Sequence, residues 1–339
     1  MSATPHRASN GSPHRRGGFI IVAVLWILMA LATLVSVYSI YVGNSALSLA
    51  AMDDGVQIEA LVRTGLELTA YRLTAATGGT PTNGTQTSGT QTNRTPTGGT
   101  PPTHGAFRFR LGAANVAVSY LTENARVDLN TAPKDMLAGL FAALGASNEE
   151  ADWSADRIIG WRTSPKRGPD RPGVEGAEDQ LYRAANLAYL PRGGPLAHLS
   201  ELWLIHGLSP ALIMRAMPFV TIYSGQETIN VFDAPPEVIA ALPGMSPARL
   251  NSFLSRRDTV PHDADGLALL IGSDNQAGGT VEPSKAMRVR VQIAFDNGRK
   301  TASEVVILIG SDAEPYRILS WRDDADAATD QPQTATRLR

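Results

Sequence analysis

The clearest hydrophobic pattern in this chain is a long apolar run close to its start. No Asp, Glu, Lys or Arg occurs between Gly17 and Met52, and the residues from Phe19 to Tyr41 are predominantly apolar. A helix needs about 20 apolar residues to cross the hydrocarbon core of a bilayer, and this run is long enough to do so. The pattern predicts a membrane-spanning helix that tethers the rest of the chain.

Helix-compatible sequence continues beyond the apolar run to about Ala76, and no proline interrupts it. In this second part the apolar residues cluster on one side of a 3.6-residue period, which is typical of a helix packed on a domain. These residues are Ile58, Leu61, Val62, Leu66 and Leu73. One continuous helix over residues 19–76 would be roughly 87 Å long at the rise of an α-helix.

Period-2 alternation marks two groups of strands that are far apart in the sequence. The first group lies within residues 107–121 and the second within 287–321, where Asp296-Asn297-Gly298 has the composition of a hairpin turn. Helical sequence separates the two groups. The patterns predict an α+β fold with a long N-terminal helix, a small antiparallel sheet and a large inserted α-helical domain.

The same patterns predict the domain organisation. Residues 77–105 are dominated by Gly, Thr, Pro, Asn and Gln, and such a tract buries too little apolar surface to offset its ordering entropy. The predicted segments are a leader (1–18), a transmembrane and spine helix (19–76), a flexible loop (77–105), the first part of the sheet (106–124), the inserted domain (125–285), the last part of the sheet (286–322) and a disordered tail (323–339).

One phrase occurs twice in the predicted insert, at Val127–Pro133 and at Ile229–Pro236. Each copy has a polar residue that could cap a helix, Asn130-Thr131 in the first and Asp233 in the second, with Pro close to the first helical turn. A helix–Gly–helix pattern follows each copy. The phrase resembles a helix-hairpin-helix or SAM-like element, some of which bind the DNA backbone.

Nucleic-acid binding is nevertheless not the function that this phrase predicts. The phosphate-binding version of the element needs a second glycine whose backbone N–H points at phosphate at a helix N-terminus. The matching positions here read Pro243-Gly244-Met245-Ser246, without that glycine. The net charge of −2 also argues against a protein whose main task is to grip phosphates. We expect these elements to pack or to contact protein.

The composition and the motifs of the chain exclude several kinds of covalent, metal and catalytic site. The chain contains no cysteine, so disulfides and thiolate metal sites are excluded. No phosphate-cradling loop, nucleophile elbow or HExxH-like histidine spacing occurs, and we predict no catalytic site.

Arg7, Arg15 and Arg16 precede the apolar run, whereas Asp53 and Asp54 are the first charges after it. This bias predicts a cytoplasmic N-terminus and an extracytoplasmic bulk.

The start of the apolar run has an unusual order. Gly17 and Gly18 come directly after the basic leader and before the apolar residues, whereas a secretory signal has its small residues after a shorter apolar core. A cut behind Gly18 would release a chain that begins with Phe19 and keeps its helix. This order resembles the class III leader of type IV pilins and type II secretion pseudopilins, in which a prepilin peptidase cuts after the glycine and methylates the new N-terminus. An uncleaved signal anchor is the alternative.

Taken together, the leader, spine, bracketing strands and helical insert resemble the protein K family of type II secretion minor pseudopilins. Major pseudopilins carry Glu at the fifth mature position, whereas this family lacks it, and that position is Ala23 here. The two repeated phrases and the amino-acid sequences of residues 176–186 and 199–202 also resemble those of the family.

This resemblance implies a non-enzymatic, single-pass inner-membrane protein with a periplasmic domain. It would sit at the tip of the pseudopilus with minor pseudopilins I and J and would support export of folded proteins across the outer membrane. Its other expected partners are the major pseudopilin, the inner-membrane secretion platform and the prepilin peptidase. A DNA-uptake receptor and a type IV minor pilin are the rival interpretations.

The resemblance also implies a possible calcium site at Glu178 and Asp179. Calcium takes six to eight oxygen ligands, and Asp170 and Glu175 lie in the same acidic loop. Basic residues in that loop, such as Arg171, leave a solvated acidic loop as the alternative.

Overall fold

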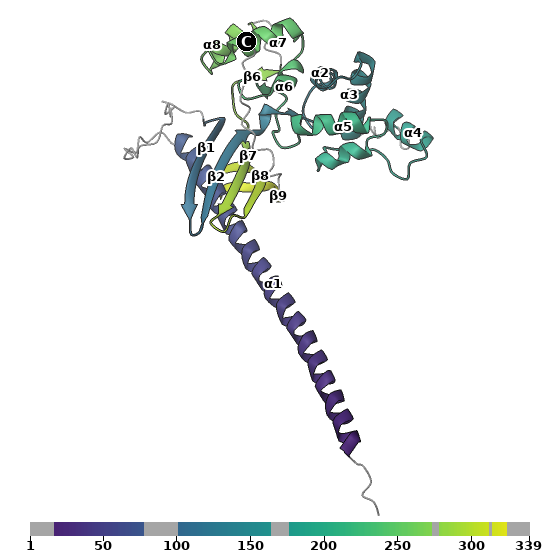
Figure 1. Ribbon diagram of the computed structural model, residues 1–339. Coiled ribbons are helices and arrows are strands. Elements are labelled where there is room, and N and C mark those ends of the chain that lie inside the picture. Colours follow the sequence, from purple (N-terminus) through teal and green to yellow (C-terminus); the bar gives the residue numbers. More distant parts are fainter. Residues whose placement is uncertain (1–16, 78–100, 164–175, 273–277, 312–313, 324–339) are drawn as a thin grey trace, which may run out of the picture. The chain divides into compact units, whose positions relative to one another are not determined.

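The computed structural model describes residues 17–77, 101–163, 176–272, 278–311 and 314–323 (Figure 1). The predicted leader up to Arg16, most of the predicted flexible loop (77–105) and the tail after Asp323 lie outside these residues. The fold is α+β, as predicted, with an N-terminal apolar helix, an antiparallel sheet and further helices. By contacts, the chain divides into two compact units at Ala60 and Leu61.

The helix α1 (Gly17–Thr77) is continuous, as the absence of proline predicts. From Leu61 onward it presents one apolar stripe to the second unit, and Leu61, Val62, Leu66 and Leu73 are each at most 3% exposed. The spacing of these residues keeps them on one face of the helix. Ile58, predicted as part of the stripe, is only half-buried.

The sheet has five antiparallel strands in the order β1-β2-β7-β8-β9 (Figure 1). Its strands are β1 (His104–Leu111), β2 (Ala114–Thr122), β7 (Ala286–Phe295), β8 (Lys300–Ser311) and β9 (Glu314–Asp323). Strand β2 pairs directly with β7, so the two groups of strands predicted from the sequence form one sheet. The first strand begins earlier than the pattern indicated, because Gly105 pairs with Tyr120.

The last turns of α1 lie against one face of this sheet. A Cβ added to Gly65 would stand 3.1 Å from a methyl group of Val118 and 3.4 Å from one of Val291, so glycine permits the close approach. Val118 and Val291 are themselves a cross-strand pair. At the edge, the Arg72 guanidinium lies 4.1 Å from the centre of the Phe107 ring, a distance typical of a cation–π contact.

The insert between β2 and β7 is a set of short helices with two small parallel strand pairs. Its elements are η1 (Glu123–Ala125), β3 (Val127–Asp128), α2 (Lys134–Ala143), α3 (Asn148–Arg162), α4 (Ala177–Ala184), η2 (Leu199–Leu204), α5 (Pro210–Ala216), η3 (Met217–Phe219), β4 (Val220–Thr221), β5 (Ile229–Asn230), α6 (Pro236–Ala240), α7 (Pro247–Arg257), α8 (Ala264–Ile271) and β6 (Gly279–Thr280). They share one buried apolar core to which residues from Val127 to Ile271 contribute.

The two copies of the repeated phrase adopt matching structures. In each copy a two-residue strand makes a parallel pair, β3 with β4 and β5 with β6, and a turn then leads into a helix. The predicted helix caps are wrong, because Pro133 and Pro235 occupy the N-cap positions of α2 and α6. Their φ angles of −67° and −68° are those that the proline ring imposes.

The polar residues of the phrase shape the turn instead of capping the helix. The Asp128 carboxylate accepts from the backbone N–H of Asn130 at 2.8 Å, and the Asn230 side chain accepts from that of Phe232 at 3.0 Å. Side chains of this type favour such local bonds in turns. The assignment of these elements to the SAM-like or helix-hairpin-helix class stays a prediction.

Candidate functional site

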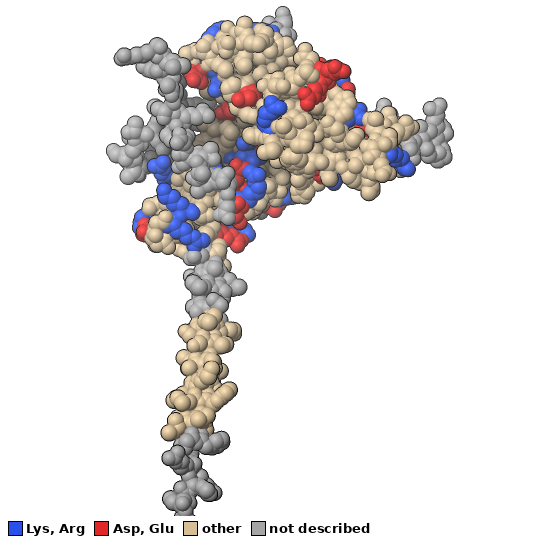
Figure 2. Space-filling model, turned by 45° about the vertical axis from the view of Figure 1, so that its right-hand side comes forward, with Lys and Arg blue, Asp and Glu red and all other residues tan. Residues whose placement is uncertain are grey.

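The apolar part of α1 has the properties of a membrane segment. Ile21–Val42 has a mean hydropathy of 2.5, none of it is buried, and the side chain of Trp26, for example, is 70% exposed. Figure 2 draws this stretch in tan, without the blue or red of charged residues. Among the described residues it is the one helix long and apolar enough to cross a bilayer. So much exposed apolar surface is unfavourable in water and indicates a lipid or protein environment.

The predicted processing and tip residues lie at the start of this helix. Gly18 and Phe19 fall in the first turn of α1, and Ala23 falls within its apolar segment. Processing at Gly18 and the tip-marking role of Ala23 stay predictions.

A buried charge network joins the sheet to the insert. Glu123 in η1 is fully buried, and its carboxylate accepts from Arg288 of β7, with a distance of 2.6 Å between Nε and Oε1. The same carboxylate accepts from the hydroxyl of Thr221 in β4. Arg288 also bonds Glu304 of β8. Strands β4 and β7 therefore meet at Glu123 at the entrance to the insert, and β8 is joined to them through Arg288, which gives the junction a fixed geometry.

The electrostatics of this junction favour its ionised state. Burial by itself would raise the pKa of Glu304, but the nearby arginines Arg288, Arg322 and Arg126 together outweigh burial and lower the pKa of that carboxyl. Arg322 of β9 adds a second cation, 2.7 Å from the same Glu304 oxygen. Buried charges are tolerated when they are paired and hydrogen-bonded in this way.

A second link between sheet and insert comes from His104 at the start of β1. Its Nδ1 lies 2.6 Å from a carboxylate oxygen of Asp233, in the second repeated phrase. The hydrogen bond to Asp233 raises the pKa of His104 and outweighs burial, which lowers it. Asp233, predicted as a helix cap, thus acts as the partner of a histidine on the sheet.

The arginines near the repeated phrases bind backbone carbonyls. Arg162 at the end of α3 donates to the carbonyl of Ala132 at 2.7 Å, and Arg257 at the end of α7 donates to that of Ala234 at 2.8 Å. Both carbonyls belong to the residue just before the capping proline. Sequence reasoning missed this shared contact, although an arginine in the last turn of the second helix after each phrase was a visible signal.

The helix–Gly–helix loops are likewise engaged in internal contacts. Gly145, Gly207 and Gly244 all have positive φ, as helix-ending glycines often do. The hydroxyls of Ser147 and Ser246 accept from N–H groups in the first turns of α3 and α7, the groups that a phosphate would otherwise bind. These contacts favour a packing role, and the absence of nucleic-acid binding stays a prediction.

The predicted calcium residues are described only in part. Glu178 lies in the first turn of α4, and its two carboxylate oxygens lie 2.9 Å and 3.0 Å from Nη1 of Arg157. The Glu178 carboxylate fills the space that a Cβ on Gly160 would need. Burial raises the pKa of Glu178, and Arg157 opposes that effect. Glu178 is therefore the partner of an arginine in this structure.

The described residues do not by themselves form a calcium site. Within them, no group of three or more His, Asp or Glu side chains is placed so that it could hold a metal ion. Asp179 is half-buried beside Glu178, whereas Asp170 and Glu175 lie outside the described residues. The calcium site at Glu178 and Asp179 stays a prediction.

Comparisons with known proteins point to one family. Residues 114–225 match the family model described as type II secretion system (T2SS), protein K. The type II secretion system protein K of Klebsiella pneumoniae is 34% identical over 88 residues, which are 26% of this chain and 27% of that relative. The matched stretch therefore spans about a quarter of the relative's length.

A solved structure that aligns with part of the chain is the GspK–GspI–GspJ complex from the type 2 secretion system of enterotoxigenic Escherichia coli. One chain of it aligns with a TM-score of 0.49 and 18% identity, over 65% of this chain and 83% of that chain. The family match includes β2, the first repeated phrase and β4, all of which adjoin the Glu123 junction. Residues 114–225 of the chain are therefore similar to the type II secretion system protein K.

Proposed function

We propose that this chain is a minor pseudopilin of a type II secretion system. It caps the tip of the periplasmic pseudopilus together with minor pseudopilins I and J, and so supports export of folded proteins across the outer membrane. The single observation that carries this proposal is the match of residues 114–225 to protein K. The apolar segment Ile21–Val42 in a continuous helix supports it, because a pseudopilin needs both an anchor and a spine.

In the proposed topology the chain crosses the inner membrane once, with its N-terminus in the cytoplasm. The arginines before the apolar run and the aspartates after it support this orientation. A prepilin peptidase removes residues 1–18, leaving Phe19 as the first residue. Assembly then proceeds on the inner-membrane platform, next to the major pseudopilin.

Ala23 supports the position at the tip. In a filament, Glu at the fifth mature position would neutralise the N-terminal amine of the subunit added above it. A subunit with none above it has no such amine to pair, and an ionised carboxylate in the hydrocarbon region is costly. The apolar Ala23 avoids this cost, and the large insert would hinder the stacking of a further subunit.

The junction geometry explains how the insert could serve as a cap. The Glu123–Arg288 pair and the His104–Asp233 pair attach the insert to the sheet at two places. The sheet is in turn packed on α1 from Leu61 onward. Partners that bind the insert would therefore act on the sheet as well, without a flexible joint between them.

The test is reconstitution of the full-length chain in detergent, alone and co-expressed with pseudopilins I and J of the same bacterium. We expect a discrete complex with one copy of this chain, measured by light scattering and native mass spectrometry. The chain purified alone is the matched control and should not polymerise. Open head-to-tail filaments of the chain alone, or no association with I and J, would refute the proposal.

A further inference from the structure

The insert carries a groove between its two helix–Gly–helix pairs. These pairs are α2 with α3 and α6 with α7, and α2 lies between α3 and α6 (Figure 1). The groove has a volume of about 1090 Å³ and is lined by residues of all four helices and of the loop between α6 and α7. Small-molecule pockets usually have volumes of about 300–1000 Å³, so this groove has room for a segment of polypeptide.

One face of α2 forms a wall of the groove with small side chains. Ala138, Gly139, Ala142 and Ala143 line it, together with Asp135 in the first turn of the helix. Their spacing of three and four positions places them on one face, which is about 12 Å long from Asp135 to Ala143. The distance between two packed helices depends on the side chains at their contact, so this wall allows a further helix to approach closely.

The rest of the lining offers larger apolar side chains. Leu242, Met245 and Leu250 line the groove from the loop and from α7. Met245 and Leu250 are half-buried, so part of each side chain remains accessible. A Cβ at Gly139 would stand 2.5 Å from the carbonyl oxygen of Ala241, which shows how closely α2 approaches the end of α6. The base of the groove is therefore apolar and tightly packed.

The rim of the groove is acidic. Asp135, Asp152 and Glu237 line it from three different helices, and no Lys or Arg of the described chain lines it. Within the part of the chain that the structure describes, none of these three carboxylates forms an ion pair. The neighbouring Lys134 is engaged elsewhere, since it is hydrogen-bonded to Asp156 at 2.8 Å. The N-termini of α3 and α7 also reach the groove, but a helix end carries only about half an elementary charge, so the three carboxylates outweigh them.

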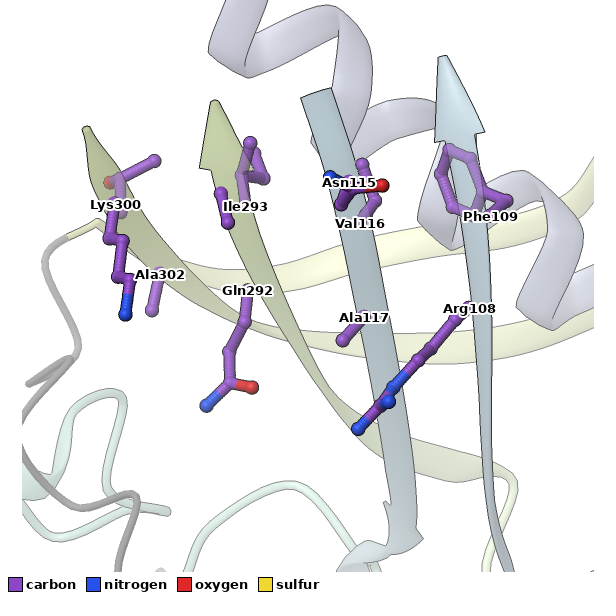
Figure 3. A pocket seen from close by; sticks show the side chains of 11 residues that line it. Arg108, Phe109, Asn115, Val116, Ala117, Gln292, Ile293, Lys300 and Ala302 are labelled. Carbon is purple, nitrogen blue, oxygen red and sulfur yellow. The ribbon is translucent and has the colours of Figure 1, made fainter. Parts of the chain in front are cut away.

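A smaller groove on the sheet has the opposite charge and serves as an internal comparison. It has a volume of about 550 Å³ and is lined by residues of β1, β2, β7 and β8. Figure 3 shows the side chains of Arg108 and Lys300 extending to the same side of the sheet at this groove, and no Asp or Glu of the described chain lines it. A basic segment would be repelled there and attracted to the groove of the insert.

We propose that the groove of the insert binds a basic amphipathic helix of a partner protein. The helix lies along the small side chains of α2, its apolar face contacts Met245 and Leu250, and its Lys or Arg side chains pair with the acidic rim. The described residues that line the groove belong to helices and one loop, so they offer an extended partner no strand edge. This inference is independent of the proposed role at the tip, because it rests on the shape and charge of the groove.

The test is fluorescence anisotropy of a labelled synthetic peptide mixed with the full-length chain in a nonionic detergent. The peptide is an alanine-rich amphipathic helix with Leu on one face and Lys beside that face, and the same peptide with Glu in place of Lys is its control. Micelles without the chain provide the blank. We expect saturable binding of the Lys peptide that weakens as salt is added, and no binding of the Glu peptide. No saturable binding of the Lys peptide would overturn the proposal.

Charge-reversing variants locate the binding site. Asp152→Lys combined with Glu237→Lys should weaken binding of the Lys peptide by about tenfold or more, because two attractions at the rim become repulsions. Asp258→Lys combined with Asp265→Lys is the matched control. It changes the net charge equally at exposed positions of the insert that do not line the groove, and it should bind as the wild type does. Equal losses in the two double variants would overturn the proposal.

A filled groove tests the shape and excludes a second copy as the occupant. Ala143 is exposed and lines the groove, so Ala143→Leu should weaken binding of the peptide without any change in charge. Circular dichroism should show the same fold as in the wild type. If the chain formed dimers that Ala143→Leu dissociates, measured by light scattering, the occupant would be a second copy and the proposal would be wrong.

Discussion

Glu123 and Arg288 form a buried ion pair although 165 positions separate them in the sequence, with 2.6 Å between Arg288 Nε and Glu123 Oε1. Glu123 ends the first part of the sheet and opens the insert, and Arg288 lies in the strand that follows the insert. The pair therefore joins the two ends of the insert. The stability of the whole second unit should therefore depend on it.

Replacing Glu123 with Gln should lower the free energy of unfolding by about 3 kcal/mol, because it leaves the Arg288 charge buried with one anionic partner fewer. The measurement is urea denaturation of the full-length chain in detergent, followed by tryptophan fluorescence. Asp296→Asn is the control, since it breaks the exposed pair with Arg110 and should cost less than about 1 kcal/mol. Equal losses in the two variants would contradict a special role for the buried pair.

Gly139→Ala should destabilise the insert even though alanine favours helices over glycine by about 1 kcal/mol. A Cβ at Gly139 in α2 would stand 2.5 Å from the carbonyl oxygen of Ala241, which follows α6. Overpacking of this kind typically costs about 1–3 kcal/mol, and a backbone atom yields less than a side chain. We expect a net loss in thermal stability, measured by circular dichroism.

Gly55→Ala is the matched control for that variant. Gly55 also lies in a helix, but a Cβ there would meet nothing within 4 Å. It should show no loss of stability. If Gly139→Ala were as stable as this control, the contact between α2 and the residue after α6 would not be tight.

The His104–Asp233 pair should make stability depend on pH. The pKa of His104 is raised from 6.5 in the folded chain, chiefly by its hydrogen bond to Asp233. The pair therefore contributes fully below pH 6.5, and its contribution is lost as the pH rises through the higher folded pKa. The difference in Tm between wild type and His104→Gln should be largest below pH 6.5 and should shrink above it.

A double-mutant cycle with Asp233→Asn checks the source of this pH dependence. Either single substitution should remove the part of the pH dependence of Tm that comes from the His104–Asp233 pair. The double variant should show no further change in that pH dependence. If the pH dependence persisted in Asp233→Asn, His104 would owe its shift to another group.

Gly18→Val should block processing of the leader. The larger side chain would replace the residue directly before the proposed cut, so the chain should keep residues 1–18 and its N-terminal methionine. Intact-mass spectrometry of the protein from membranes checks this. Gly17→Val is the control and should be processed, with Phe19 as its first residue. An unprocessed wild-type chain would show instead an uncleaved signal anchor.

Ala23→Glu should impair secretion, on the order of tenfold, because an unpaired carboxylate within the hydrocarbon region costs a few kcal/mol. The readout is the amount of exported protein in the culture medium of a strain that lacks the native gene. Ala23→Val keeps the position apolar and should secrete as wild type does. Full secretion by Ala23→Glu would contradict the role of this residue at the tip.

Local sequence patterns determined the elements that depend on neighbouring residues. Charge-free apolar sequence from Phe19 and the absence of proline determined α1, because helix formation depends on spacing and on backbone donors within a few residues. Alternation determined the strands of the sheet. The repeated phrase was visible in advance as well, since each of its turns is made by a side chain that bonds two residues on.

The tertiary structure alone decided which distant residues meet. The pairing of Glu123 with Arg288, of Asp233 with His104 and of Glu178 with Arg157 joins residues on different elements. The sequence indicated a helix cap at Asp233, which is wrong, and the family resemblance implied a calcium ligand at Glu178, which stays a prediction. A charged residue shows its type in the sequence, but its partner is set by the packing of the core, which brings together elements that no local pattern connects.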